Sequence, residues 1–366
     1  MAKERKEMRV SVVSPNTNQH SVHSYFNTSP ESPDGRWVLY YTSTTSEGHE
    51  GDICIVERAT GKVKTLAKGV IVEDAHRVAC QQWISQGQRV VFHDLRDGEW
   101  VVISVDINSQ KERVLARGRQ VGWGQPNTHI IPLYGPHWAP GEHRNLELLN
   151  VETGDIQTVV TAFEVKETYT EWVSENFGDR EISIFFPIIS PDLSRVFFKI
   201  ATPAGGDFRS SKASLRKGLV CYDLKQSRFL FLAKWGHPAW HPNSRDIINV
   251  SGSNLILING DTGSVQTIPD LPRFPASHPS ISQDGQFFTT ETRLKSFGGA
   301  KEEWGIVMGD IQGKDFEIVY EFDNSQGATS WRPSHPHPVF SLDGKRLYFN
   351  VSATKWTQLY MAEYGD

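Results

Sequence analysis

Short runs rich in β-branched and aromatic residues alternate with polar turns along the whole chain. A turn that resembles Ser-Pro-Asp-Gly recurs seven times, for example at Ser32–Gly35, Ser190–Leu193 and Ser341–Gly344. Its third residue falls at positions 34, 86, 140, 192, 243, 284 and 343, a spacing typical of propeller blades. Each complete repeat holds four such runs, so the pattern predicts an all-β fold, a seven-bladed β-propeller with four-stranded blades.

The seventh repeat lacks a fourth run, while an unpaired run at Arg9–Val13 precedes the first repeat. We expect this N-terminal strand to complete the last blade and close the ring, because closure protects strand edges. Residues 1–366 are thus predicted to form a single domain, with blades starting near residues 28, 76, 129, 184, 237, 278 and 335. The segment Thr161–Phe177 has helical spacing, which indicates an insertion (161–177) between the third and fourth blades.

Composition narrows the classes of partner. The 38 basic and 43 acidic residues give a net charge of −5, which argues against nucleic-acid binding. No apolar stretch approaches the ~20 residues that a membrane helix needs, and the first ten residues are charged where a secretory signal is apolar. Three scattered cysteines, Cys54, Cys80 and Cys221, do not form a disulfide framework. We therefore expect a cytoplasmic protein with no nucleic-acid or membrane partner, and the oligomeric state stays open.

The first strand of each propeller blade lines the central channel, so residues at one register of these strands face each other. Six positions before the third turn residue, the seven occupants are Thr28, Cys80, Tyr134, Phe186, His237, His278 and His337. The last three are each followed by proline, and His335 lies on the same strand face as His337 because side chains alternate along a strand. The register therefore predicts four imidazoles at one mouth of the channel.

Neutral imidazole is the most common protein ligand for Zn, Mn, Fe and Cu ions. Three ligands with an open position describe a metal site that acts on a substrate. The alternative is that these histidines only start strands and form hydrogen bonds with neighbouring loops. Cys80 is either a further soft ligand or a buried inert thiol.

Three C-terminal segments resemble the oligogalacturonate lyases, a family of seven-bladed propeller polysaccharide lyases. Ser334–Glu363, which contains His-Pro-His-Pro, resembles the C-terminal signature of that family. Trp235–Pro242 resembles its Gly-His-Pro blade start, and Ser277–Gly285 resembles its preceding metal-ligand blade. Nearer the N-terminus the resemblance is architectural only.

The resemblance implies a Mn²⁺ ion held by His278, His335, His337 and a glutamine, whose position is occupied here by Arg332. A guanidinium cannot ligate a metal, so the ion would have three protein ligands plus water, or a different fourth group. Arg332 would instead bind a substrate carboxylate. Zn²⁺ or another divalent ion remains an alternative.

The resemblance also implies a carbon–oxygen lyase activity on uronate oligosaccharides. A base removes the C5 proton, the 4-O-glycosidic oxygen leaves, and a 4,5-unsaturated product forms by β-elimination. The family base is an arginine upstream of the Gly-His-Pro blade, which leaves Arg209 and Arg216 as candidates, with His237 as a further catalytic residue.

Two other interpretations remain open. A propeller lyase of another uronate polymer would use a histidine and a tyrosine as acid and base. The candidates for these roles are His76, His93, Tyr134 and His137. His76 and His93 are also candidate substrate-binding residues. A non-catalytic propeller scaffold would share the turns, but it has no reason to concentrate imidazoles on its last three blades. The chain has no Gly-x-Ser-x-Gly nucleophile elbow.

Overall fold

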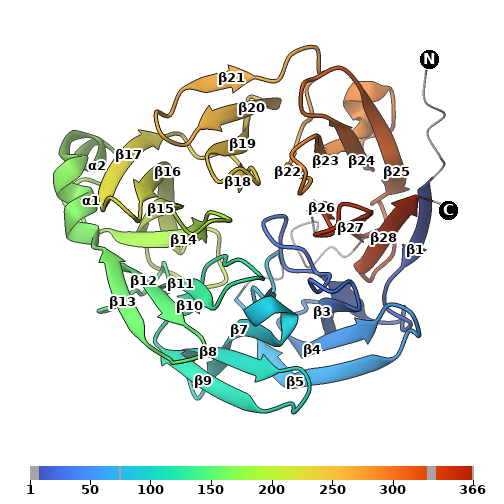
Figure 1. Cartoon of the computed structure of the whole chain (residues 1–366), viewed down its shortest axis with the longest axis horizontal. Helices are drawn as coiled ribbons and strands as arrows, with labels where there is room; N and C mark the ends of the chain where they lie inside the picture. The colour runs from blue at the N-terminus through green and yellow to red at the C-terminus, as the bar shows by residue number, and fades with distance from the viewer. Residues whose placement is uncertain (1–7, 74–75, 328–334, 365–366) are drawn as a thin grey trace.

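Seven antiparallel four-stranded sheets surround a central channel in the computed structural model, which describes residues 8–73, 76–327 and 335–364 (Figure 1). The predicted all-β, seven-bladed propeller is confirmed for the described chain. Arg332 lies outside the described residues. No helix in the described ranges is both long enough and apolar enough to cross a membrane.

The first four blades follow each other along the chain. Blade 1 comprises β2 (His20–Val22), β3 (Trp37–Ser43), β4 (Glu50–Glu57) and β5 (Val63–Ile71). Blade 2 comprises β6 (Gln82–Ile84), β7 (Arg89–Arg96), β8 (Glu99–Asp106) and β9 (Glu112–Arg117). Blade 3 comprises β10 (Gln120–Val121), β11 (Ile130–Tyr134), β12 (Leu146–Asn150) and β13 (Ile156–Val160). Blade 4 comprises β14 (Ser183–Ile189), β15 (Arg195–Pro203), β16 (Ser214–Asp223) and β17 (Arg228–Ala233).

The last three blades complete the ring. Blade 5 comprises β18 (Ala239–Trp240), β19 (Asp246–Ser251), β20 (Asn254–Asn259) and β21 (Val265–Thr267). Blade 6 comprises β22 (Ser280–Ile281), β23 (Phe287–Arg293), β24 (Glu303–Asp310) and β25 (Phe316–Asp323). Blade 7 comprises β26 (Val339–Phe340), β27 (Arg346–Val351), β28 (Gln358–Tyr364) and β1 (Met8–Val12). Short 3₁₀ turns lie at Ser85–Gly87 and Leu294–Phe297.

The N-terminal strand closes the ring as predicted. β1 pairs antiparallel with β28, with Val10 opposite Ala362, and so supplies the outer strand of blade 7. Figure 1 shows the blue N-terminal strand beside the red C-terminal strands. The predicted insertion forms α1 (Ala162–Thr168) and α2 (Thr170–Phe177), which begin at a capping box between Thr161 and Glu164.

The repeated turn works through its serine and aspartate side chains. In blade 7 the Ser341 hydroxyl donates to Asp343 at 2.7 Å and accepts from the Arg346 amide at 3.0 Å. Gly344 has a φ of +71°, which favours glycine. Wherever this sequence occurs, these hydrogen bonds stabilise the turn that connects the first strand of the blade to the second.

Two predicted blade starts are wrong. Blade 3 begins at Gln120 and not near residue 129, because its first turn, at residues 125–128, lacks the repeated pattern and the Trp138–Gly141 turn joins its second and third strands. Tyr134 therefore ends the second strand and is not at the channel register of the first strands. Blade 1 begins at His20 and not near residue 28, because residues 23–28 bulge out of its first strand before the bridge between Glu31 and Val38.

The bulge of blade 1 fills the middle of the channel with aromatic side chains. Tyr25 and Phe26 are both buried. The Tyr25 ring stacks on Trp123, with centroids 5.5 Å apart, and meets Phe186 edge-on at 5.4 Å. These contacts separate the two mouths of the channel.

Candidate functional site

Blades 5, 6 and 7 place their histidines in the same way. His237, His278 and His337 each lie two residues before the innermost strand of their blade. In blades 5 and 6, a side chain of the second strand binds the backbone amide of the histidine. Asn249 Oδ1 accepts from the His237 amide at 2.7 Å, and Glu291 Oε2 accepts from the His278 amide at 3.2 Å. The shared register thus comes from the repeat itself.

His337 is a buried polar side chain with no hydrogen bond to the described chain. Neither of its ring nitrogens has a partner among the described residues, although the side chain is fully enclosed. Its backbone φ is +48°, a strained value for a residue with a side chain, and the His23 ring contacts its carbonyl at 2.8 Å. Burial, followed by the charges of His76 and His278, lowers the pKa of His337 well below its usual value. The ring is therefore neutral, and either nitrogen can offer its lone pair to a metal, depending on the tautomer.

Four imidazoles form what we call the histidine cluster, which comprises His76, His278, His335 and His337. Their six ring-to-ring centroid distances lie between 4.4 and 5.9 Å. Within it, His76, His278 and His337 offer donor atoms that all lie within 4.8 Å of one another, close enough to hold one ion. Blades 2, 6 and 7 thus contribute to one point.

Glu291, a buried carboxylate of β23, supports this cluster. It forms a short hydrogen bond with His278 Nδ1, and its Oε1 lies 3.6 Å from His335 Nδ1. Burial alone would raise the pKa of Glu291, but its hydrogen bonds and electrostatic interactions with the His278 and His335 rings outweigh burial and lower the pKa to about 2. These three residues also form a second group with donor atoms within 4.8 Å. A carboxylate beside a ligating histidine fixes the orientation of the ring.

The cluster differs in one member from the four imidazoles that the sequence predicts. The His237 ring is tilted by 37° relative to the His278 ring, with centroids 3.9 Å apart, and its Nδ1 faces the Ser277 carbonyl at 3.0 Å. Burial lowers the pKa of His237 to about 3. His76, which the sequence offers as a substrate-binding residue, takes the place expected for His237 in the cluster.

Three cationic side chains, which we call the basic group, lie around the aromatic residues of blades 4 and 5. The guanidinium carbons of Arg77 and Arg216 lie 5.6 and 5.7 Å from the Phe185 ring centroid. Lys199 Nζ lies 4.3 Å above the ring of Trp235. Because Arg77 directly follows His76, the basic group adjoins the histidine cluster, an arrangement suited to an anionic ligand.

A network of buried polar side chains around Glu73 holds the Arg77 guanidinium in position. Its guanidinium pairs with Glu73, whose other oxygen accepts from Gln120 Nε2 at 2.6 Å. His137 Nε2 lies 3.8 Å from the Glu73 carboxylate, and His137 Nδ1 lies 2.6 Å from the Ser214 hydroxyl. Arg77 is thus held between a carboxylate and the site.

The remaining predicted residues lie in different surroundings. Tyr134 is fully buried, and burial raises the pKa of its hydroxyl well above the usual value. His93 accepts from the Val121 amide at 3.3 Å, and burial lowers its pKa to about 4. Arg209 donates to the Val72 carbonyl at 3.4 Å, whereas Arg216 belongs to the basic group. The guanidinium of Arg216 lies over the Phe185 ring, whereas that of Arg209 lies over the Phe208 ring.

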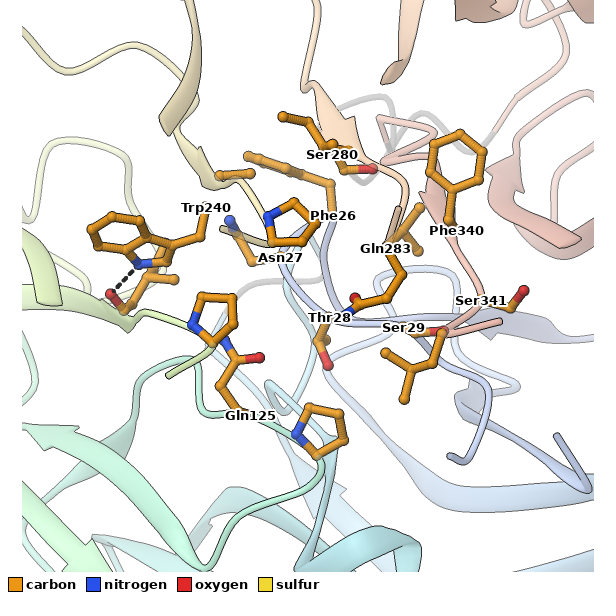
Figure 2. A pocket seen from close by; sticks show the side chains of 18 residues that line it. Phe26, Asn27, Thr28, Ser29, Gln125, Trp240, Ser280, Gln283, Phe340 and Ser341 are labelled. Carbon is orange, nitrogen blue, oxygen red and sulfur yellow. Dashed lines mark hydrogen bonds between the residues drawn. The ribbon is translucent and has the colours of Figure 1, made fainter. Parts of the chain in front are cut away.

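The opposite mouth of the channel is chemically different. Phe26 and Thr28 of the bulge, together with residues of the first turns such as Gln125 and Gln283, line a cavity of about 100 Å³ (Figure 2). None of its lining residues carries a charge, and the Trp240 indole at its wall donates to the Ile188 carbonyl at 2.9 Å. The charged chemistry is therefore concentrated on the histidine side.

Three residues of the site have no motif in the sequence. Glu291 stands at a buried position of a strand otherwise rich in threonine, and such an enclosed charge is the one signal that could have marked it. Lys199 and Arg77 become recognisable only when the ring brings blades 2, 4 and 5 around the channel.

No family model matches the sequence, and neither does any curated protein. Solved structures do match. An oligogalacturonate lyase in complex with manganese is 14% identical, with a TM-score of 0.65 over 100% of this chain and 99% of that chain. An oligogalacturonate lyase from Vibrio parahaemolyticus is 14% identical, with a TM-score of 0.66 over 98% of this chain and 94% of that chain. The likeness is one of fold.

A similar fold also occurs in a protein of a different kind. A chain of a mitotic checkpoint complex is 13% identical, with a TM-score of 0.57 over 98% of this chain and 94% of that chain. Since one fold serves different functions, the function must be argued from the residues of the site.

Proposed function

We propose that this chain is a divalent-metal-dependent lyase that cleaves uronate oligosaccharides of the oligogalacturonate type by β-elimination. The observation that carries the proposal is the histidine cluster beside the basic group, in which the buried His337 ring has no hydrogen-bond partner among the described residues. The likeness to two oligogalacturonate lyases along the whole chain supports it. A cytoplasmic location belongs to the same proposal.

The residues present fit a divalent ion. His76, His278 and His337 offer three nitrogen donors at one point, and burial keeps the His278 and His337 rings neutral, the form that binds metals. A bound ion would supply a Lewis acid for the substrate carboxylate. Manganese in one structural neighbour favours Mn²⁺, whereas nitrogen donors also suit Zn²⁺.

The basic group then binds and orients the anionic oligosaccharide. Arg77 and Arg216 carry permanent charges that suit a planar carboxylate. Neutralising the carboxylate makes the adjacent C5 proton easier to remove, because the developing negative charge spreads onto the carboxylate oxygens. Glu73, which pairs with Arg77, keeps that guanidinium in place during the reaction.

The direct test is the formation of the unsaturated product. Purified protein, supplied with Mn²⁺ or Zn²⁺, is incubated with oligomers of galacturonate, glucuronate or iduronate, and the ultraviolet absorbance of the conjugated alkene is followed. We expect absorbance to rise with galacturonate oligomers and to stop when a chelator removes the metal. No rise with any of the three oligomers would contradict the proposal and favour a non-catalytic propeller.

A further inference from the structure

We propose that Lys199 is the general base of this site, the group that removes the C5 proton, and this inference rests on the proposed function. Lys199 lies on β15, the second strand of blade 4, opposite Phe185 of β14. Its side-chain nitrogen lies 4.3 Å above the ring of Trp235, which precedes the Gly-His-Pro start of blade 5. Lys199 is thus the cross-strand neighbour of Phe185, the ring over which the guanidinium groups of Arg77 and Arg216 also lie.

The charged groups that face Lys199 come from three neighbouring elements. Arg216 of β16 and Arg77 of the loop before β6 both act on it electrostatically with the same sign. His237, in the loop before β18, is coupled to it from the third side and is neutral because of its own burial. Among the described residues, none of the carboxylates forms an ion pair with the amine. The surroundings therefore disfavour an ammonium ion.

Burial, reinforced by Arg216 and Arg77, lowers the pKa of Lys199 to about 7. An amine with such a pKa is substantially unprotonated at neutral pH and matches the ideal for a general base. A guanidinium holds its proton to a pKa above about 12, so the arginines of the site are poor bases and good carboxylate partners. The three cations thus divide into two that bind charge and one that transfers a proton.

The step balances without a co-reactant. The Lys199 Nζ lone pair takes the proton from C5, the electrons of the C5–H bond form the C4–C5 double bond, and the bond from C4 to the glycosidic oxygen breaks. That oxygen leaves with the electron pair and takes a proton from water. The ammonium formed on Lys199 then loses its proton to solvent.

The test uses two variants that separate charge from proton transfer. Lys199→Arg keeps the positive charge but stays protonated, and Lys199→Met removes both. Lys217, an exposed lysine of the same blade, gives the control Lys217→Met. We expect both Lys199 variants to lower kcat by about 100-fold or more, while KM rises in Lys199→Met only. The control should keep the wild-type values.

The pH profile gives the second readout. Below a pKa of about 7 the wild-type base becomes protonated, so kcat/KM should fall with decreasing pH, and the residual activity of Lys199→Arg should lack this limb. A Lys199→Arg variant that keeps wild-type kcat, or that keeps the same acid limb, would overturn the inference. Either result leaves the lyase activity itself intact, whereas failure of the proposed function would appear as a wild-type protein that forms no unsaturated product.

A third readout does not depend on activity. Acetylation of the full-length protein with acetic anhydride, followed by mass spectrometry, measures how the reaction rate of each lysine depends on pH. Lys199 should reach half of its maximal rate near pH 7, well below the ordinary lysine pKa of about 10.4. A midpoint for Lys199 near that ordinary value would contradict the inference.

Discussion

Glu291 makes the same kind of contact from the second strand of blade 6 that Asn249 makes in blade 5, although it lies one residue further along its strand. Both side chains accept a hydrogen bond from the amide of the blade's histidine. Glu291 adds a negative charge and a hydrogen bond to the His278 ring, which Asn249 does not give to His237. The charge therefore distinguishes the histidine that belongs to the cluster from the one that lies outside it.

Replacing this charge tests its role at the residue scale. Glu291→Gln keeps the amide acceptor but removes the carboxylate that orients and polarises His278, so we expect metal affinity to fall 10- to 100-fold. Asn249→Asp, which adds a charge in blade 5, should not raise metal affinity. Calorimetric titration of the metal measures both. Unchanged affinity in Glu291→Gln would show that the carboxylate only holds the backbone.

The sequence predicts part of the site at this scale. His278, His335 and His337 could be named because the repeat places them at one register. His76 could not be placed among them, since its contact with His337 crosses from blade 2 to blade 7 and depends on the closed ring. The charged partners of these residues have no local pattern at all.

At the scale of elements, the ring is closed by one short strand. Val10 of β1 pairs with Ala362 of β28 and packs against the core of blade 7. Without this strand, the edge of β28 would be open to solvent and to other chains. The other outer strands follow their blades directly in the chain, so β1 is the element that links the two ends.

A charge within β1 should therefore destabilise the whole ring. Val10→Asp places a carboxylate against a partly buried apolar surface, and we expect the free energy of unfolding to fall by about 1–3 kcal/mol. Val265→Asp, on the exposed outer strand of blade 5, should change it by no more than about 0.5 kcal/mol. Chemical denaturation measures both variants. Equal effects would mean that β1 does not clasp the ring.

The missed elements share a physical cause. The Ser-Pro-Asp-Gly pattern marks a turn through its side-chain hydrogen bonds, and the first turn of blade 3 replaces them with contacts such as that of Thr128 with the Gln125 carbonyl at 3.1 Å. The bulge at residues 23–28 leaves its strand to pack Tyr25 and Phe26 in the channel. Both depend on tertiary contacts that a local pattern does not encode.

At the scale of the molecule, the fold could be predicted almost entirely. A repeated supersecondary unit constrains architecture strongly, because each blade buries its faces against its neighbours. Function is a separate matter, since the same ring occurs in an oligogalacturonate lyase and in a mitotic checkpoint complex. In this chain, blades 2, 6 and 7 converge on one group of nitrogen donors.

Metal titration of the wild-type protein and of His337→Ala tests that convergence most directly. The His337 ring has no hydrogen bond to the described residues, so the variant removes a metal donor and ring packing without breaking a side-chain hydrogen bond among them. We predict that the wild-type protein binds one Mn²⁺ or Zn²⁺ ion per chain, and that His337→Ala remains folded and loses this binding. A wild-type protein that binds neither ion, or a variant that binds as tightly as the wild type, would contradict the account.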